Sequence, residues 1–282
     1  MAEKTGLVLE GGAMRGMFTT GALDVFMENG ITFDGMLGVS AGATFGCNFK
    51  SKQIGRAIRY NKKYAHDRRY CSFYSLFTSG DLYNAKFCYD ELPNELDLFD
   101  YETFDNNPME FYVGTTDADT GEPLYHKITD SRKGMDWIRA SASMPGVSRP
   151  VRIGDKTLLD GGISDSVPLE YFESIGYTKN VVILTQPRDF VKQPVEHFAI
   201  MKFLLRKYPK LIDTIAVRHE RYNKEREYIL SREKAGAALV ICPEKALGIS
   251  RTEKNVDELE RVYQEGRAVA MKRLEEIKKF LS

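Results

Sequence analysis

Residues that ligate metal ions are few and scattered in this chain. It has four cysteines and four histidines in 282 residues, with no Cys-x-x-Cys pair and no ligand-type spacing around the histidines. The cysteines are Cys47, Cys71, Cys88 and Cys242. Structural zinc sites and disulfide frameworks need paired spacings that these residues do not offer. We therefore expect a reduced interior that holds no metal and no cofactor.

The chain also lacks net charge and any long apolar run. Lysines and arginines number 40, as do aspartates and glutamates, so the formal net charge is zero. A nucleic-acid binder needs an excess of basic residues, and we exclude that class of partner. No apolar stretch approaches the roughly 18 residues of a membrane span, and a strand-like run starts as early as Leu7. These features predict a soluble, cytoplasmic protein.

What the sequence does contain is a repeated unit of strand, glycine turn and helix. Residues 7–9 are β-prone and precede a glycine turn, after which apolar residues recur at helical spacing over 15–29. The second unit has a strand at 36–39 and a long helix at 41–64. Two such units in succession predict a parallel sheet. Further strands are predicted at 110–116, 123–128, 151–153, 156–159, 180–185 and 237–242, and further helices at 133–142, 168–175, 194–207, 209–234 and 255–280.

Basic and apolar residues are unevenly distributed along the chain. Residues 50–69 hold eight Lys or Arg against one Asp, whereas 86–136 hold thirteen Asp or Glu against four Lys or Arg. Two solvated faces of opposite charge explain this pattern, and contact with anionic lipid is the alternative. The apolar segments 73–84 and 198–205 have basic flanks and suit either the core or a lid at a lipid interface. Transient contact with a membrane surface is therefore one of our hypotheses.

A serine with glycines two residues before and after it lies between a predicted strand and a predicted helix. The segment Gly38-Val39-Ser40-Ala41-Gly42 matches G-x-S-x-G, the sequence of a nucleophile elbow. So abrupt a turn brings the two flanking positions together, and glycine is the residue that fits there. It leaves the serine strained and exposed at a helix N-terminus, which favours developing negative charge. The competing interpretation is an ordinary glycine turn.

A second glycine loop, Gly11 to Gly16, also joins a strand to a helix. Small residues allow successive backbone N–H groups to face one concavity, which suits a phosphate or an oxyanion. The P-loop pattern fails because Met17 and Phe18 follow Gly16, and the dinucleotide pattern fails at Ala13. A nucleotide site is thus the weaker interpretation. Arg15, in the first turn of the helix, is expected to be exposed. The alternative is that Arg15 steadies the first loop or binds an anionic head group.

An acidic residue before two glycines, Asp160-Gly161-Gly162, ends another β-prone run. Such a sequence is commonly a simple turn. In open α/β sheets, however, reactive groups gather outside the carboxyl ends of the strands, which is where Asp160 and Ser40 are both predicted to lie.

Taken together and in this order, these motifs resemble those of the patatin-like phospholipase family. Its bacterial members with a helical C-terminal extension are the most similar. The resemblance includes the segment Ala140-Ser141-Ala142-Ser143-Met144-Pro145-Gly146. It implies a three-layer α/β/α sandwich with a mainly parallel central sheet. The implied domains are a catalytic core at 1–186 and, packed on it, a mainly helical extension at 187–282 with one strand near 238–242.

The resemblance also implies site residues, namely a Ser-Asp dyad that uses no histidine and no metal. Ser40 becomes the nucleophile and Asp160 the general base. The implied oxyanion hole consists of Gly11, Gly12, Ala13 and Ala41, and the supporting motif residues are Arg15, Gly16, Gly38, Gly42, Gly161 and Gly162. Family members usually have three successive glycines where this chain has Ala13 in the third place. If that position needs a positive φ, the alanine is strained.

A carboxylate of ordinary pKa, ~3.9, is a poor base for a serine hydroxyl. We therefore expect an apolar neighbourhood, such as Leu158 and Leu159, to raise the pKa of Asp160. The function predicted from the sequence is hydrolysis of acyl ester bonds in phospholipids or lysophospholipids. The motifs do not specify the head group, the acyl chain or the oligomeric state.

Three alternatives stay open on the sequence. An acyl-CoA thioesterase or acyltransferase would use the same dyad, and a non-catalytic regulatory module would use the first glycine loop to bind a nucleotide. A Ser-His-Asp triad would recruit His197 or His219, which follow Asp160 in the usual hydrolase order. His197 adjoins an apolar segment and His219 lies among charged residues, so both have ordinary structural explanations.

Overall fold

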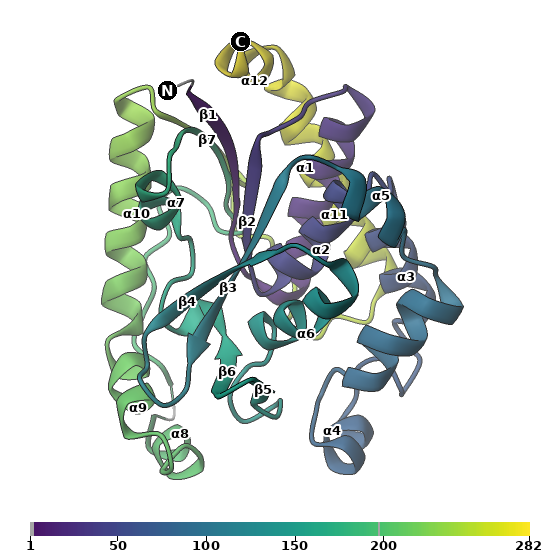
Figure 1. Cartoon of the computed structure of the whole chain (residues 1–282), viewed down its shortest axis with the longest axis vertical. Coiled ribbons are helices and arrows are strands. Elements are labelled where there is room, and N and C mark those ends of the chain that lie inside the picture. The colour runs from purple at the N-terminus through teal and green to yellow at the C-terminus, as the bar shows by residue number, and fades with distance from the viewer. Residues whose placement is uncertain (1–2, 197) are drawn as a thin grey trace.

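A mixed eight-stranded sheet forms the centre of the molecule (Figure 1). The computed structural model describes residues 3–196 and 198–282. The strands are β1 (Lys4–Leu9), β2 (Gly35–Val39), β3 (Glu110–Asp117), β4 (Pro123–Ile128), β5 (Val151–Ile153), β6 (Lys156–Asp160), β7 (Tyr177–Ile183) and β8 (Ala238–Ile241). Their order is β5-β6-β3-β2-β1-β7-β8, with β4 also paired to β3. Every predicted strand is present.

The middle of the sheet is parallel and buried on both faces. Strands β3, β2, β1, β7 and β8 run parallel, whereas β4, β5 and β6 join by antiparallel pairing. Alternate residues of β1 enter different clusters: Leu7 and Leu9 belong to one apolar cluster and Val8 to another. A strand covered on both faces needs a continuous apolar run, which explains the Leu-Val-Leu sequence.

Helices cover both faces of the sheet and give the three predicted layers. They are α1 (Gly16–Glu28), α2 (Ala41–Lys50), α3 (Arg56–Tyr64), α4 (Phe73–Ser79), α5 (Tyr101–Asn106), α6 (Ser131–Ser141), α7 (Leu169–Ser174), α8 (Phe198–Leu204), α9 (Pro209–Ala216), α10 (Arg218–Lys234), α11 (Val256–Lys272) and α12 (Leu274–Leu281), with a π-helix at Phe87–Leu96. Figure 1 shows α10 on one side of the sheet and α1, α2 and α11 on the other. The predicted α/β/α sandwich is confirmed. Within the residues described, no helix is long and apolar enough to cross a membrane.

The helix predicted at 41–64 is two helices, and that prediction is corrected. Helix α2 ends at Lys50, and α3 begins at Arg56. Between them Lys52 (φ 55°) and Gly55 (φ 70°) adopt left-handed backbone conformations. The Gly55 N–H donates to Asp24 Oδ2 at 3.0 Å, which fixes the break against α1.

Three C-terminal helix predictions also differ from the structure. The helix predicted at 209–234 breaks at Val217 (φ −98°, ψ 5°) and the one at 255–280 breaks at Arg273 (φ −103°, ψ 9°). The helix predicted at 194–207 is described over Phe198–Leu204. At the second break, Arg273 donates to the carbonyl of Val240 in β8. Tertiary contact therefore determines where that helix ends.

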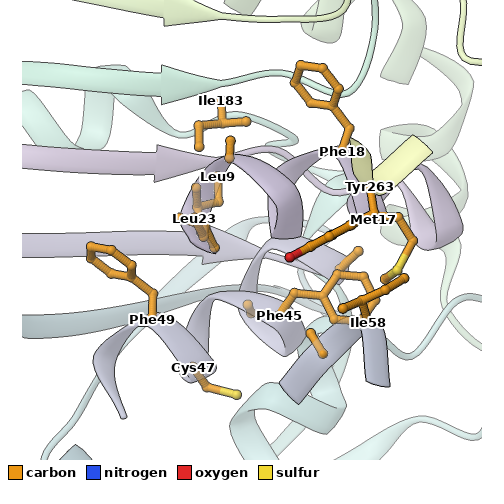
Figure 2. Packing of buried hydrophobic residues seen from close by; sticks show 14 of the residues in the cluster. Leu9, Met17, Phe18, Leu23, Phe45, Cys47, Phe49, Ile58, Ile183 and Tyr263 are labelled. Atoms are coloured by element: carbon orange, nitrogen blue, oxygen red, sulfur yellow. The ribbon is translucent and has the colours of Figure 1, made fainter. Parts of the chain in front are cut away.

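The C-terminal helix α11 lies directly against α1 because two glycines allow close approach. A Cβ on Gly266 would lie 1.9 Å from the Phe18 carbonyl oxygen, and one on Gly21 would lie 2.0 Å from the Tyr263 carbonyl oxygen. Figure 2 shows Tyr263 of α11 near Met17 and Phe18 of α1 in the largest apolar cluster. The last part of the chain is thus built into the same core as the first.

Candidate active site

Two strand ends meet on one edge of β3. Val39, the last residue of β2, is opposite Gly114, and Asp160, the last residue of β6, is opposite Thr115. Strand β4 occupies the other edge of β3 at Thr115, so β6 must share the edge that β2 uses. Since β2 and β6 approach from opposite directions, Ser40 and Asp160 come together where the two strands end.

The turn after β2 has the geometry of a nucleophile elbow. Ser40 has φ 53° and ψ −120°, a conformation that non-glycine residues rarely adopt. A Cβ on Gly38 would lie 2.7 Å from the carbonyl carbon and oxygen of Gly42, and one on Gly42 would lie 2.4 Å from the Leu9 carbonyl oxygen. The two flanking glycines approach each other as the motif predicts, and they hold the serine in its strained conformation.

The Ser40 hydroxyl donates a hydrogen bond to Asp160. The distance from Ser40 Oγ to Asp160 Oδ2 is 2.7 Å, and Asp160 Oδ1 accepts from the Gly162 N–H at 2.8 Å. Asp160 is 5% exposed. Burial raises the pKa of its carboxyl group, while the bond from Ser40 and the charge of Arg218 act in the opposite direction. The raised pKa agrees with the expectation from the sequence.

The first glycine loop lies against the elbow. A Cβ on Gly11 would be 2.9 Å from Ser40 Cβ, and one on Gly12 would be 2.6 Å from Thr185 Oγ1. Ala13 has φ 49°, so this alanine occupies a backbone region that favours glycine. Of order 1 kcal/mol of strain is expected for such a residue. The loop thus presents its backbone to Ser40 at the position where the motif predicts an oxyanion hole.

The remaining motif residues allow close packing around the loops. A Cβ on Gly16 would lie 2.7 Å from the Phe45 ring and 3.0 Å from Ala41 Cβ. A Cβ on Gly161 would lie 2.3 Å from the Gly114 carbonyl oxygen. Ala41 begins α2, so its N–H belongs to the first helical turn, where N–H groups lack intrahelical partners.

Sequence reasoning missed the residue that fixes the Ser40 backbone. Ser141 Oγ accepts from the Ser40 N–H at 2.8 Å and donates to the Gly114 carbonyl at 2.6 Å. Ser141 lies in the segment 140–146 that contributes to the family resemblance, but nothing in that segment indicates which strand it contacts. The neighbouring Ser143 carbonyl accepts from the Asp160 N–H at 2.9 Å, so this one segment contacts both members of the pair.

The sequence did not predict Arg218, nor the contacts that bring a group of charged and polar side chains beside the pair. Arg218, the first residue of α10, donates from Nε to the Gly162 carbonyl at 2.5 Å. One helical turn later, the Tyr222 hydroxyl donates to Glu10 Oε1 at 2.6 Å. Arg15 was expected to be exposed, but it is partly buried and its Nε has no hydrogen-bond partner among the described residues. These side chains come from segments far apart in the sequence, which left no local pattern to find.

Histidines do not contact the pair in the part of the chain described. The hydrogen bonds of Ser40 and Asp160 go to serine, glycine, threonine and alanine residues and to each other. His219 Nε2 lies 3.9 Å from Glu220 Oε1, and His126 stacks on Trp137. His197 lies outside the described residues. Across 3–196 and 198–282, no group of three or more His, Cys, Asp or Glu side chains is arranged to hold a metal ion.

Residues 7–173 match the family model described as patatin-like phospholipase, which covers more than half of the chain. The chain belongs to the patatin-like phospholipase family. Residues 208–282 match a second model, described as a domain of unknown function (DUF6363). The patatin-like match ends before β7, and the second match includes β8, so the sheet combines strands from both matched regions and from the segment between them.

Relatives of this patatin-like chain include both bacterial and fungal proteins. The uncharacterized protein YjjU of Escherichia coli is 33% identical over 194 residues, covering 67% of this chain and 54% of YjjU. The lysophospholipase nte1 of Aspergillus fumigatus is 27% identical over 189 residues, covering 61% of this chain and 11% of that protein. The chain thus spans about half the length of YjjU and a much smaller part of the lysophospholipase. Among solved structures, VipD from Legionella pneumophila matches 97% of this chain and 67% of its own, with 13% identity and a TM-score of 0.49.

Proposed function

We propose that this protein hydrolyses acyl ester bonds of lipids, with phospholipids or lysophospholipids as substrates. The observation that carries the proposal is the 2.7 Å hydrogen bond from the strained Ser40 hydroxyl to the buried carboxylate of Asp160. Membership of the patatin-like phospholipase family supports it, as does the similarity to proteins named lysophospholipases.

In the proposed reaction, Ser40 Oγ attacks the ester carbonyl carbon while its proton moves to Asp160 Oδ2. The carbonyl π electrons move to oxygen, and the N–H groups of residues 11–13 and Ala41 stabilise that oxyanion. The intermediate collapses, the alcohol leaves with the proton from Asp160, and the acyl group remains on Ser40. Water then attacks the acyl-serine and gives a proton to Asp160. The second intermediate collapses, the fatty acid leaves, and Ser40 Oγ takes the proton back from Asp160, which restores the dyad. Each oxyanion donor would lower the barrier by about 3 kcal/mol.

Burial of Asp160 gives the dyad a chemical advantage. A base works best when its pKa is close to the working pH, and burial moves the pKa of this carboxyl upward from its ordinary value. The Gly162 N–H holds one carboxylate oxygen, which leaves the other directed at Ser40. The proton therefore has one defined acceptor.

A small cavity of about 40 Å³, lined mostly by apolar side chains and by Arg56, lies beside the nucleophile helix. Its lining includes Thr44, Cys47, Tyr89, Leu92 and Ile138. Thr44 lies one turn after Ser40 in α2, and its hydroxyl donates to the Ser40 carbonyl at 3.1 Å. We propose that the first few carbons of the acyl chain enter on this side of α2, where apolar side chains replace their contact with water; the cavity is too small for the rest of the chain.

Two helices with exposed apolar residues flank the Asp160 end of the sheet. Phe73 and Phe77 of α4 are 83% and 93% exposed, and Phe203 of α8 is 67% exposed. Figure 1 shows α4 and α8 at the same end of the molecule, on either side of β5 and β6. The segment 143–149 connects them to the site: Val147 accepts from the Leu82 N–H just after α4, and Gly146 lies next to Leu204 of α8.

We propose that this surface makes transient contact with a lipid bilayer. Basic side chains accompany the aromatic ones, with the Arg68 guanidinium 4.7 Å from the Tyr74 ring centroid and that of Arg206 5.0 Å from the Phe203 ring centroid. Apolar side chains flanked by cations are typical of interfacial helices that meet anionic lipid. A bilayer bound there would present its esters to the end of the sheet that carries Ser40.

Covalent labelling tests the nucleophile. A fluorophosphonate probe should label the wild-type protein on the peptide that contains Ser40. We expect no labelling of Ser40→Ala and full labelling of the control Ser282→Ala, because Ser282 is an exposed serine just after α12 and belongs to neither glycine loop. Labelling that persists in Ser40→Ala would overturn the proposal. Preferential hydrolysis of acyl-CoA over lysophospholipid would retain the dyad but contradict the substrate class.

Vesicle sedimentation tests the bilayer contact. The double variant Phe73→Ser, Phe77→Ser should bind vesicles containing anionic lipid at least about tenfold more weakly than wild type, since two exposed aromatic side chains no longer enter the interface. Leu98→Ser is a matched control, because Leu98 is 64% exposed and lies outside α4 and α8. Equal sedimentation of wild type and the double variant would contradict this part of the proposal.

A further inference from the structure

Four cationic side chains from separate segments lie near one another on the side of Asp160 where Arg218 contacts Gly162. Arg218 reaches the Gly162 carbonyl, and the Gly162 N–H binds Asp160. The Lys192 ammonium lies 3.9 Å from the ring centroid of Tyr222, one turn after Arg218 in α10. The Lys192 backbone is fixed by two hydrogen bonds to the Asn223 side chain. Arg15 lies in the glycine loop, and Arg251 acts electrostatically on both Asp160 and Lys192.

Among the described residues, these cations form no direct ion pair with a carboxylate, although Glu10 and Asp160 act on them from a greater distance. In the described part of the chain, no carboxylate oxygen lies within 4.0 Å of a side-chain nitrogen of any of the four cations, Arg15, Lys192, Arg218 and Arg251. The oxygens of the nearby Glu10 accept from the Thr185 N–H at 2.5 Å and from the Tyr222 hydroxyl, so Glu10 offsets part of the charge of Arg15 and Lys192 without contacting either cation.

Burial makes this excess of positive charge costly. Burial lowers the pKa of Arg218, and burial together with the charge of Arg218 lowers the pKa of Lys192 to about 8. Arg15 Nε is buried without a hydrogen-bond partner. An arginine stays protonated at neutral pH, so it cannot relieve the cost by losing its proton. Buried charges that are retained in a fold usually have a partner of opposite sign.

We propose that Lys192, Arg218 and Arg251, with Arg15, form a subsite for a phosphate group next to Ser40. A phosphate presents several oxygens to cations that approach from different directions, and guanidinium groups match it well. The inference rests on the proposed function, since the phosphate would belong to the same molecule as the ester that Ser40 attacks. Arg218 and Arg251 lie in the region that matches a domain of unknown function, which would thereby contribute to substrate binding.

Binding to the inactive protein tests the subsite without catalysis. Ser40→Ala protein is titrated calorimetrically with inorganic phosphate and with glycerol 3-phosphate, alone and combined with Lys192→Met or Arg251→Gln. We expect both variants to weaken binding at least tenfold, which is about 1.4 kcal/mol. The matched controls Lys245→Met and Arg152→Gln change exposed cations elsewhere and should bind like the parent. Absence of binding, or equal binding by all variants, would overturn the subsite.

Lys192→Met keeps an unbranched chain against Tyr222, and Arg251 is exposed, so each variant removes charge with little loss of packing. Melting temperatures show whether Lys192→Met or Arg251→Gln fails to fold. If one of them does, the other variant is compared with the parent protein.

Kinetics then distinguishes the source of the phosphate. The kcat/KM values for a lysophospholipid and for a monoacylglycerol with the same chain are compared in wild type, Lys192→Met and Arg251→Gln. We expect the ratio of the two values to fall at least tenfold in both variants. Inorganic phosphate should inhibit cleavage of the lysophospholipid more strongly than that of the monoacylglycerol. Both variants could instead keep the wild-type ratio of the two kcat/KM values although the protein binds phosphate. That result would mean that the subsite binds free phosphate, and it would overturn the role of the subsite in binding the lipid.

Failure of the two proposals can be told apart. If wild type hydrolyses neither lipid and Ser40 is not labelled, the proposed function is wrong, whatever the phosphate titration shows. If wild type hydrolyses both lipids with a ratio that no variant changes, the dyad stands and the lipid-phosphate subsite is wrong.

Discussion

Two of the three described non-glycine residues with positive φ lie in the two glycine loops of the candidate site. Ser40 and Ala13 both have positive φ values, 53° and 49°. Strain of this kind costs of order 1–3 kcal/mol per residue and persists where surrounding contacts leave no alternative. At Ser40 those contacts are the close approach of Gly38 to Gly42 and the bond from the Ser40 N–H to Ser141. The strain directs the hydroxyl toward Asp160.

The raised pKa of Asp160 leads to opposite effects on activity and stability. The folded protein holds the carboxyl proton more tightly than the unfolded chain does, so stability should rise as pH falls through the raised pKa. Activity should fall over the same range, because the base becomes protonated. We expect Asp160→Asn to lose about 100-fold or more in ester hydrolysis without a lower melting temperature at neutral pH, since a neutral amide avoids the cost of burying charge.

Kinetic and thermal measurements on the same preparations, between about pH 4 and pH 8, check both effects. The control Asp155→Asn lies in the hairpin between β5 and β6 and is exposed, so it should match wild type in rate and in melting temperature. An Asp160→Asn protein with wild-type activity would remove this residue from the mechanism.

The sequence predicts the backbone strain at Ser40 and the pairing of Ser40 with Asp160, because both predictions follow from local glycine patterns. Glycines around Ser40 and after Asp160 require tight turns, and the parallel sheet brings strand ends to one edge. The same reasoning could not find Lys192, Arg218 or Ser141, since each acts through a contact made by tertiary packing. For Arg15 the prediction of exposure was wrong because segments far along the chain cover the first turn of the helix.

At the scale of elements, glycine determines how closely helices approach. Gly21 in α1 and Gly266 in α11 place each helix backbone against the other. Apolar periodicity predicts that both helices are amphipathic but not that they pair with each other. Helix ends were the least predictable feature: Lys52, Val217 and Arg273 break helices where the apolar pattern continues. Their conformations depend on contacts such as the bond from Arg273 to Val240.

A methyl group at the helix crossing should be strongly destabilising. Gly266→Ala would place a Cβ 1.9 Å from the Phe18 carbonyl oxygen, so α1 and α11 must separate. We expect a loss of about 1–3 kcal/mol in the free energy of unfolding, as for other overpacked cores. Urea denaturation measures this loss. Ala268→Ser, an exposed position on α11, should stay within about 0.5 kcal/mol of wild type; an equally small effect of Gly266→Ala would contradict the packing argument.

At the scale of the whole molecule, the C-terminal extension shares the core of the patatin-like region. Strand β8 pairs with β7, and Leu259, Val262 and Ile277 are buried in the same cluster as Met17 of α1. We propose that the division at residue 186 separates two sequence regions but not two independently folding units. If the extension packed on a core that was complete without it, helices of the first region would cover α1. In this structure the backbone of α11 packs directly against α1.

Truncation tests this proposal. A chain that ends at residue 186 lacks β8, α10 and α11, and it exposes apolar side chains of α1 and of the sheet. We expect no cooperative thermal unfolding and strong binding of a hydrophobic dye, with no fluorophosphonate labelling of Ser40. The full chain is the positive control. A truncated protein that melts cooperatively and is labelled would contradict the proposal.

The crossing of α1 and α11 also bears on how the chain folds during synthesis. Residues 29–255 separate the two helices in the sequence, so α1 leaves the ribosome long before its partner exists. Until α11 emerges, the apolar stripe formed by residues such as Met17 and Phe18 has no native cover and is open to chaperones or to aggregation. Contacts between such distant segments also slow folding, since a long loop must close before they form. Completion of the core therefore comes late in synthesis, once α11 has left the ribosome.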